Sequence, residues 1–440
     1  MTYIKRQIDS VLTDWKDDAY RKPLLIRGAR QVGKSSAVRN LAKSFDYYIE
    51  INFEMQKSMH LIFEQDLDPH KICEELSLLT NTPIIPGRTL LFLDEIQSCL
   101  PAISSLRFFY EKFPELHVVA AGSLLESALK RLASYGVGRI RSLYMYPFSF
   151  EEFINASGES GLYEALVNCK VGEPFSEPVH FKFLDYLIRF VIIGGMPEVV
   201  ATYIRTGSLL DCQVILDDLI NSFYDDFAKY KSNVPTSRLK EVFISVVNQT
   251  GNKFVYSKAS TDANHLQIKE SVELLQLAGL IFPITHSSGN GVPLAAEINL
   301  KYRKFIILDT GVFQRILGLE ISDLILGAKL EQINKGELAE IFVGMELVKK
   351  YFKFNAAQLF YWQRESQGSQ AEIDFLVQSG RNIVPIEVKS GTRGKMQSLY
   401  LFLREKNLQI GVRTSMENIG EVDKIRIFPM YAITRLLKQL

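Results

Sequence analysis

The 440-residue sequence predicts an α/β fold that begins with a parallel β-sheet covered by helices on both faces. Three observations lead to this prediction. Short apolar runs alternate with helical stretches from Pro23 to Met145, a glycine-rich segment directly follows the first run, and an Asp-Glu pair ends the third run. The expected strands are residues 24–27, 47–53, 89–93, 117–121 and 142–145, and an amphipathic helix precedes them within residues 1–20.

The pattern changes twice after residue 147, which indicates further domains. A helical region opens with a capping box, in which Ser149 is the N-cap and Glu152 lies three residues on. Further along, three helices precede two strands, 280–285 and 294–300, as in a winged helix-turn-helix. The expected domains are a nucleotide-binding sheet domain (1–147), a helical lid (148–233), a winged helix (234–300) and a mixed α/β domain (301–440).

The overall composition is that of an ordinary globular protein. With 47% hydrophobic and 23% charged residues, a disordered or fibrous chain is excluded. The four cysteines form no C-x-x-C pair, so neither a disulfide framework nor a zinc site is indicated. The N-terminus lacks the apolar core of a signal peptide, and no stretch approaches the roughly 20 apolar residues of a membrane helix. We therefore expect a cytoplasmic protein with no membrane partner.

Charge is distributed unevenly along the chain. The 51 Lys and Arg nearly balance the 50 Asp and Glu overall, but residues 301–440 contain 21 basic and 15 acidic residues. This surplus makes the C-terminal third the region best suited to contact DNA or RNA, although the surplus is mild for a polyanion-binding surface.

Residues 28–35, Gly-Ala-Arg-Gln-Val-Gly-Lys-Ser, match the phosphate-binding pattern G-x-x-x-x-G-K-[ST] without departure. Its glycines permit a backbone whose N–H groups point inward around phosphates, and the following helix adds its N-terminal dipole. Lys34 would reach the β/γ-phosphates and the Ser35 hydroxyl would coordinate Mg²⁺. The expected nucleotide-binding residues are Gly28, Ala29, Arg30, Gln31, Val32, Gly33, Lys34, Ser35 and Ser36.

Polar residues that follow three later strands complete this site. A buried strand ending in Asp94-Glu95 would deliver Asp94 to the magnesium and leave Glu95 to orient or deprotonate the attacking water. Ser123 follows a strand expected to lie between the two motif strands, where it would either sense the γ-phosphate or cap the next helix. Arg139 is either an arginine finger acting on a neighbouring subunit or a solvated surface cation, so an oligomer is left open.

Several segments together resemble the prokaryotic AAA-type ATPases that carry a C-terminal domain of unknown function with a restriction-endonuclease-like core. The resemblance implies ATP binding and covers nearly the whole chain. The segments that carry it are 21–35, Leu93-Asp-Glu-Ile-Gln97, Ala121-Gly-Ser-Leu-Leu125, Val137-Gly-Arg139, Tyr146-Pro-Phe-Ser-Phe-Glu-Glu-Phe153, Gly194-Gly-Met-Pro-Glu198 and 224–230.

The C-terminal region contains a second candidate site. Asp374 lies on one predicted strand and Glu387-x-Lys389 on the next, and alternation places Glu387 and Lys389 on one face. The D-x(12)-E-x-K spacing is the signature of the nuclease superfamily that the resembled C-terminal domain is similar to, with Asp374 and Glu387 as ligands of a second Mg²⁺ and Lys389 orienting water. Glu340, on a preceding helix, could add a fourth polar group. The alternatives are a nuclease fold that only binds, or a salt bridge on a solvated sheet face.

Two functions follow from these observations. The first is a Mg²⁺-dependent ATPase that acts on, or is gated by, DNA or RNA through a nuclease-like effector domain. The second is a signalling or scaffold ATPase with a protein partner and an inactive nuclease-like binding domain. The expected recognition helix, residues 267–277, carries Glu270 and Glu273 beside Lys269, a poor surface for phosphates, which favours the second function. The convergence of Asp374 with the Glu387-x-Lys389 pattern favours the first, so the sequence leaves both functions open.

Overall fold

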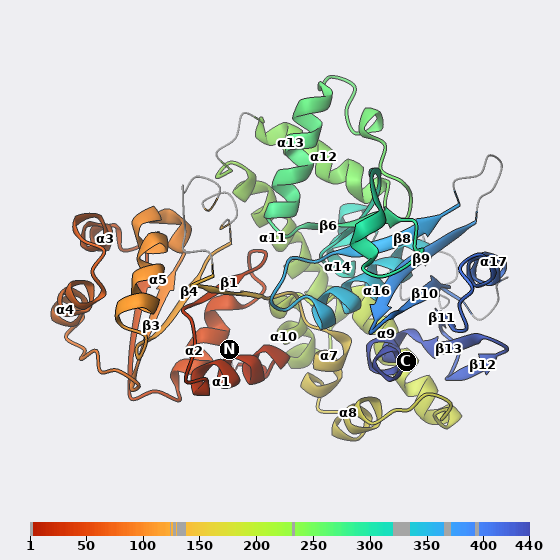
Figure 1. Cartoon of the computed structure of the whole chain (residues 1–440), viewed down its shortest axis with the longest axis horizontal. Helices are drawn as coiled ribbons and strands as arrows, with labels where there is room; N and C mark the ends of the chain where they lie inside the picture. The colour runs from red at the N-terminus through yellow and green to blue at the C-terminus, as the bar shows by residue number, and fades with distance from the viewer. Residues whose placement is uncertain are drawn as a thin grey trace. The chain divides into compact units, whose positions relative to one another are not determined.

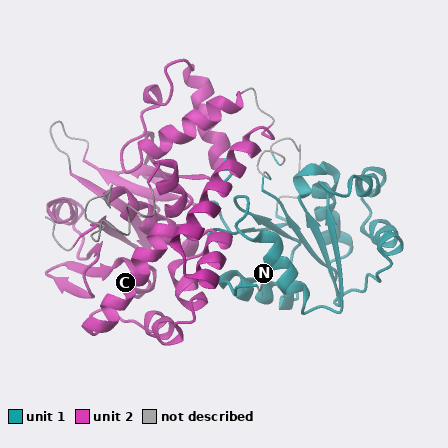
Figure 2. Ribbon diagram, turned by 180° about the vertical axis from the view of Figure 1, so that it is seen from behind, with its two compact units in different colours: residues 1–147, 277–279, 353–356 teal, residues 148–276, 280–352, 357–440 magenta. Residues whose placement is uncertain are grey.

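A computed structural model describes residues 3–123, 125, 129, 138–230, 234–319, 335–364, 371–391 and 396–440. The chain divides into two compact units, coloured separately in Figure 2. Unit 1 comprises residues 1–147, 277–279 and 353–356, and unit 2 comprises residues 148–276, 280–352 and 357–440. No helix of the described residues has the length and hydrophobicity required to cross a membrane.

Unit 1 is built on a five-stranded sheet with the order β2-β3-β4-β1-β5 (Figure 1). All four neighbouring pairs are parallel, so the predicted parallel α/β sheet is confirmed. The strands are β1 (Leu24–Arg27), β2 (Tyr47–Asn52), β3 (Thr89–Asp94), β4 (His117–Ala121) and β5 (Arg141–Tyr144). Because β4 lies between β1 and β3, the residues that follow these three strands meet at one edge of the sheet.

Helices cover this sheet, and the three central strands are predominantly apolar for that reason. Every residue of β1, β3 and β4 is buried, as expected of parallel strands packed on both faces. Leu91 and Leu93 of β3 belong to a core cluster with Phe63, Leu76 and Leu106. The helices are α1 (Gln7–Asp17), α2 (Lys34–Ala42), α3 (His60–Gln65), α4 (Pro69–Thr80) and α5 (Leu100–Lys112), with short 3-10 turns η1 (Lys57–Met59) and η2 (Ile96–Ser98). The helix expected at 124–132 falls mostly outside the described residues.

Unit 2 begins with consecutive helices. Both hydrogen bonds of the predicted capping box are present, with the Glu152 N–H donating to Ser149 Oγ (3.2 Å) and the Ser149 N–H donating to Glu152 Oε2 (2.8 Å). The helices are α7 (Phe150–Ala156), α8 (Ser160–Val167), α9 (Glu177–Ile193), α10 (Pro197–Thr206), α11 (Leu209–Phe227), α12 (Thr236–Asn248), α13 (His265–Leu277), α14 (Thr310–Ile316), α16 (Lys335–Tyr351), α17 (Gln397–Glu405) and α18 (Ile433–Leu436), and the 3-10 turns are η3 (Tyr256–Lys258), η4 (Leu294–Glu297), η6 (Met430–Ala432) and η7 (Leu437–Gln439).

The sheet of unit 2 has eight strands in the order β12-β13-β11-β10-β9-β8-β6-β7 (Figure 1). It is mixed: β6–β8, β10–β11 and β11–β13 are parallel, and the other pairs are antiparallel. The strands are β6 (Ile281–Ser287), β7 (Ile298–Ile307), β8 (Leu359–Gln363), β9 (Glu372–Ser379), β10 (Asn382–Val388), β11 (Gly411–Ser415), β12 (Gly420–Val422) and β13 (Ile425–Pro429).

The two strands expected to form a wing lie in this same sheet. β6 and β7 pair with each other in antiparallel fashion, and β6 also pairs in parallel with β8 of the C-terminal region. β7 runs across residue 300, the expected domain boundary, because its buried end Phe305–Ile307 continues the apolar run. A winged helix and a separate C-terminal domain therefore remain predictions.

The glycine pair of the segment 194–198 has a structural role in unit 2. Gly194 has φ +75°, and a Cβ placed there would lie 1.9 Å from Asp309 Oδ1. The Gly195 N–H donates to Asp309 Oδ2 (2.6 Å), while the Gly195 carbonyl accepts from the Phe148 N–H (2.7 Å). Asp309 also caps α14 by accepting from the Val312 N–H (3.1 Å). Only a residue without a side chain permits this close approach of three chain segments.

Candidate functional site

The glycine-rich segment forms a tight turn between β1 and α2. Gly28 and Gly33 have φ values of +144° and +95°, and Gln31 also has a positive φ of +64°. A Cβ at Gly28 would lie 2.1 Å from the Met145 carbonyl oxygen. The turn therefore needs glycine at this position for both backbone conformation and space, and it leads directly into α2 at Lys34.

Lys34 folds back over this turn. Its Nζ donates to the carbonyl oxygens of Gly28 (3.1 Å) and Ala29 (2.8 Å), and the residue is only 7% exposed. Burial lowers the pKa of the ammonium to about 8, against the opposing effect of Glu95 and Asp94. Because its two partners are neutral, the ammonium retains an uncompensated charge that a phosphate group can attract.

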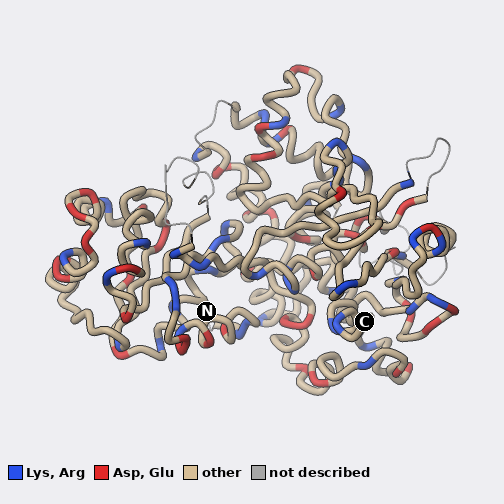
Figure 3. Tube along the Cα trace, viewed as in Figure 1, with Lys and Arg blue, Asp and Glu red and all other residues tan. Residues whose placement is uncertain are grey.

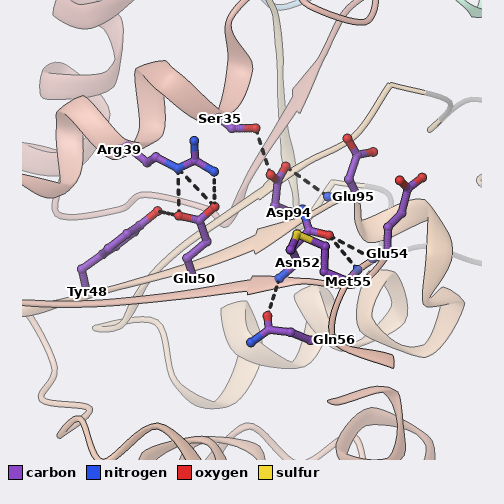
Figure 4. A network of polar contacts seen from close by, with 10 residues as sticks. All are labelled: Ser35, Arg39, Tyr48, Glu50, Asn52, Glu54, Met55, Gln56, Asp94 and Glu95. Atoms are coloured by element: carbon purple, nitrogen blue, oxygen red, sulfur yellow. Dashed lines mark hydrogen bonds and ion pairs between the residues drawn. The ribbon is translucent and has the colours of Figure 1, made fainter. Parts of the chain in front are cut away.

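Ser35 and Asp94 meet beside this turn, as the sequence predicts. Ser35 Oγ donates to Asp94 Oδ2 over 2.9 Å (Figure 4), and burial raises the pKa of Asp94. A hydroxyl and a carboxylate oxygen within hydrogen-bonding distance are the ligand types that Mg²⁺ prefers. The donor set therefore fits Mg²⁺ bound together with a nucleotide.

Glu95 is held in an unusual backbone conformation directly after β3. Its φ and ψ are +49° and +42°, a left-handed conformation that non-glycine residues adopt mainly under tertiary constraint. Gln97 provides part of that constraint, because its Nε2 donates to Glu95 Oε2 (2.6 Å). A Cβ at Gly122 would lie 2.1 Å from Gln97 Oε1. Gln97 is a site residue that sequence reasoning missed, and the glycine after β4 was the available signal.

A second network that was missed from the sequence lies beside Asp94. Arg39 of α2 forms a bidentate ion pair with Glu50 of β2 (2.6–3.2 Å), and the Tyr48 hydroxyl donates to the same carboxylate (2.7 Å; Figure 4). Glu50 is close enough to Asp94 to contribute to the raised pKa of that carboxyl. Arg39 therefore offsets the negative charge of Glu50, which is the third carboxylate near the expected metal site after Asp94 and Glu95.

Ser123 and Arg139 have different surroundings. Ser123 is half-buried after β4, whose place between β1 and β3 agrees with the predicted topology. The Arg139 side chain is 43% exposed and pairs with Glu111 of α5, which also accepts from Arg107 (2.9 Å). The sensing role of Ser123 and the arginine-finger role of Arg139 stay predictions.

Comparison with known families identifies the N-terminal region. Residues 20–154 match the family model described as an AAA domain. This segment is similar to AAA domains. Residues 184–323 match a domain of unknown function (DUF8612), and residues 335–433 match another (DUF4143). The family models thus support the predicted AAA-type ATPase, while the nuclease-like identity of the C-terminal region rests on the sequence pattern alone.

Solved structures are also similar to this chain. The Walker-type ATPase PABY2304 of Pyrococcus abyssi is 16% identical with a TM-score of 0.47, covering 72% of this chain and 96% of its own. The Aeropyrum pernix ORC1 protein in complex with DNA is 11% identical (TM-score 0.28; 73% and 92% covered), and PCH-2 of C. elegans is 12% identical (TM-score 0.25; 47% and 63% covered). No curated protein matches the sequence.

In unit 2, β9 and β10 bring the predicted C-terminal residues onto adjacent strands. Phe375 pairs with Ile386, so Asp374 and Glu387 are the next residues of the two strands. Asp374 Oδ2 accepts from the Val388 N–H (2.7 Å), and Lys389 Nζ lies 2.7 Å from Glu387 Oε1. Glu387 is 4% exposed, and its Oε2 has no hydrogen-bond partner within the described part of the chain.

Strict alternation of side chains does not hold along β9 around Asp374. The register between β8 and β9 shifts between Phe360 and Trp362, which indicates a bulge in β9 at this point. Ile373 and Leu376 belong to one core cluster, although strict alternation would place them on opposite faces. Phe375 instead lies against Gly344 of α16. Bulges are known to redirect a side chain in this way beside functional sites.

Glu340 of α16 joins Asp374, as the sequence predicts. Burial, followed by the charge of Asp374, raises the pKa of Glu340 well above its ordinary value. Burial also raises the pKa of Asp374 to about 6, although the nearby Lys304 acts in the opposite direction. Repulsion between neighbouring carboxylates is relieved either by a retained proton or by a nearby cation.

Lys304 of β7 supplies such a cation and was not predicted. It forms an ion pair with Glu372, and only 3% of its side chain is exposed. Burial alone would lower its pKa, but Glu340, Glu372 and Asp374 together raise it. The sequence signal was a lysine directly before the apolar run Phe305–Ile307, because a charged residue inside a buried strand needs a partner.

The described residues contain no group of three or more His, Cys, Asp or Glu side chains arranged to hold a metal ion. The second Mg²⁺ predicted for Asp374 and Glu387 therefore stays a prediction. Figure 3 shows that positions of Lys and Arg and positions of Asp and Glu both occur along the described parts of the two units.

Proposed function

We propose that this protein binds ATP with Mg²⁺ and hydrolyses it at the turn between β1 and α2. The observation that carries this proposal is the joint position of Lys34 on the Gly28 and Ala29 carbonyls and of Ser35 on Asp94. The AAA domain match over residues 20–154 supports the same activity.

Each residue has a distinct role in this proposal. The backbone N–H groups of residues 28–36 surround the phosphates, and Lys34 neutralises their charge. Ser35 and Asp94 hold Mg²⁺, which when bound offsets the charge that develops on the phosphate oxygens. Glu95, oriented by the Gln97 amide, accepts a proton from the attacking water.

The test of nucleotide binding compares two lysines of the same helical region. Lys34→Ala should abolish the rise in melting temperature that MgATP produces, because the phosphate charge loses its partner. Lys43→Ala changes an exposed lysine just after α2 and should retain the full rise. A Lys34→Ala protein that MgATP still stabilises would contradict the site assignment.

For the C-terminal region we propose an effector role, with two alternatives. In the first, Asp374, Glu387, Lys389 and Glu340 act on DNA or RNA in a nuclease-like site gated by ATP. In the second, the region binds a protein partner and carries no chemistry. The adjacency of Asp374 and Glu387 on paired strands supports the first. The lack of a three-ligand metal group among the described residues supports the second.

Steady-state ATP hydrolysis with and without DNA and RNA separates these alternatives, if nucleic-acid integrity is followed in the same reactions. Stimulated turnover with cleavage supports an ATP-gated nuclease. Turnover that is unaffected while the nucleic acid stays intact supports a protein-directed ATPase. A cytoplasmic location and a lid formed by residues 148–233 belong to the same proposal.

A further inference from the structure

The carboxylate cluster of unit 2 contains a positive charge of its own. Lys304 reaches it from β7, Glu372 and Asp374 from β9, and Glu340 from α16. The Lys304 ammonium pairs with Glu372 and lies 5.2 Å from the centre of the Tyr361 ring. Removal of such an ammonium from water is costly unless carboxylates surround it, and here three carboxylates act on it.

This arrangement competes with a divalent cation. Mg²⁺ and Mn²⁺ need several carboxylate oxygens directed at one point. The Lys304 ammonium occupies a lone pair of Glu372 in a charge-assisted hydrogen bond. Its charge, which Asp374 and Glu340 also stabilise, repels a second cation in a region of low dielectric constant.

We propose that Lys304 is the resident cation of the C-terminal carboxylate site and excludes divalent metal ions from it. The chain then needs Mg²⁺ only at the AAA domain, and its C-terminal region does not cleave nucleic acid by a metal-dependent reaction. This inference rests on the proposed effector role of the C-terminal region. It selects the second alternative, in which that region has no catalytic activity.

Lys389 provides a matched control within the same site. It pairs with Glu387 at 2.7 Å, but 32% of its side chain is exposed. Its ammonium is therefore solvated in part, unlike the buried ammonium of Lys304. Both variants lose one positive charge, so a difference in Mn²⁺ binding between them reports on the buried position of Lys304.

The experiment measures Mn²⁺ binding to the full chain from the decrease of the free Mn²⁺ signal in electron paramagnetic resonance. All proteins carry Asp94→Asn and are free of nucleotide, so that the AAA domain does not contribute. The parent protein should bind no Mn²⁺ below millimolar concentration. Lys304→Met should gain one site that is at least tenfold tighter, Lys389→Met should gain none, and Asp374→Asn added to Lys304→Met should remove the new site.

Two results would overturn the proposal. One is Mn²⁺ binding by the parent protein that Asp374→Asn abolishes, and the other is a folded Lys304→Met protein that gains no site. Circular dichroism checks folding, and Lys304→Gln replaces the methionine variant if that variant unfolds. ATP hydrolysis is measured separately with Asp94 intact, so its failure would remove the proposed ATPase function and leave the Mn²⁺ result standing.

Discussion

Both units bury a lysine beside carboxylates, but the two lysines have different partners. Lys34 donates to the carbonyl oxygens of Gly28 and Ala29. Lys304 instead forms an ion pair with Glu372, and the charges of Glu340 and Asp374 also act on it. Burial therefore lowers the pKa of Lys34 to about 8, while carboxylates raise the pKa of Lys304. Neutral partners leave a lysine ready for an incoming anion, and charged partners make it a fixed counterion.

The largest effect should come from Glu95. Glu95→Gln should lower ATP turnover by at least about 100-fold while ATP binding persists, because general-base assistance contributes that much or more. Glu54→Gln, an exposed glutamate just after β2, is the control and should leave turnover unchanged. Turnover by Glu95→Gln within a fewfold of the native rate would show that another group activates the water.

Replacement of each unit 2 lysine by alanine tests the fixed-counterion interpretation directly. Lys304→Ala should lower the free energy of unfolding by roughly 3 kcal/mol, because it leaves buried carboxylates without a partner. Lys389→Ala leaves the buried Glu387 without its ion-pair partner, but it removes an ammonium that is 32% exposed, so its cost should be smaller than that of Lys304→Ala. Urea denaturation without metal ions measures both, and equal losses would show that burial does not distinguish the two lysines.

The pH dependence of ATP binding tests whether the charge of Lys34 is available to an incoming phosphate. Its lowered pKa of about 8 means that the free protein carries the charged ammonium at pH 7 and loses it as pH rises through 8. The bound phosphates require the charged form, so ATP affinity should weaken by roughly tenfold between pH 7 and pH 9. Isothermal titration calorimetry measures this change. The residual affinity of Lys34→Ala, if detectable, should vary little over the same range.

The smallest effect is expected at Arg139. Arg139 forms an ion pair with Glu111, and the two side chains are 43% and 29% exposed, respectively. Arg139→Ala should therefore change the free energy of unfolding by less than about 1 kcal/mol. Thermal denaturation tests this expectation. A large loss of ATP turnover in the same stable variant would indicate that Arg139 acts on nucleotide in an assembled form.

The sequence alone determined the sheet and the phosphate site of unit 1. Their signals are local: β1 and β3 are buried on both faces and therefore predominantly apolar, and residues 28–35 follow β1 directly. The conformations that such a turn needs are encoded by glycines within a few residues. The capping box at Ser149 was predictable for the same reason, because both of its partners lie within one helical turn.

Only the tertiary structure decided the contents of the carboxylate site. Lys304 and Glu372 are 68 residues apart, and Lys304 comes from a strand expected to belong to a wing. The β9 bulge breaks the alternation around Asp374, and a single extra residue in a strand has no reliable local signal. Gln97 and Gly122 illustrate the same point in unit 1, since their fit depends on two loops that follow neighbouring strands. Local patterns thus specify elements and turns, whereas the balance of buried charges depends on which elements pack together.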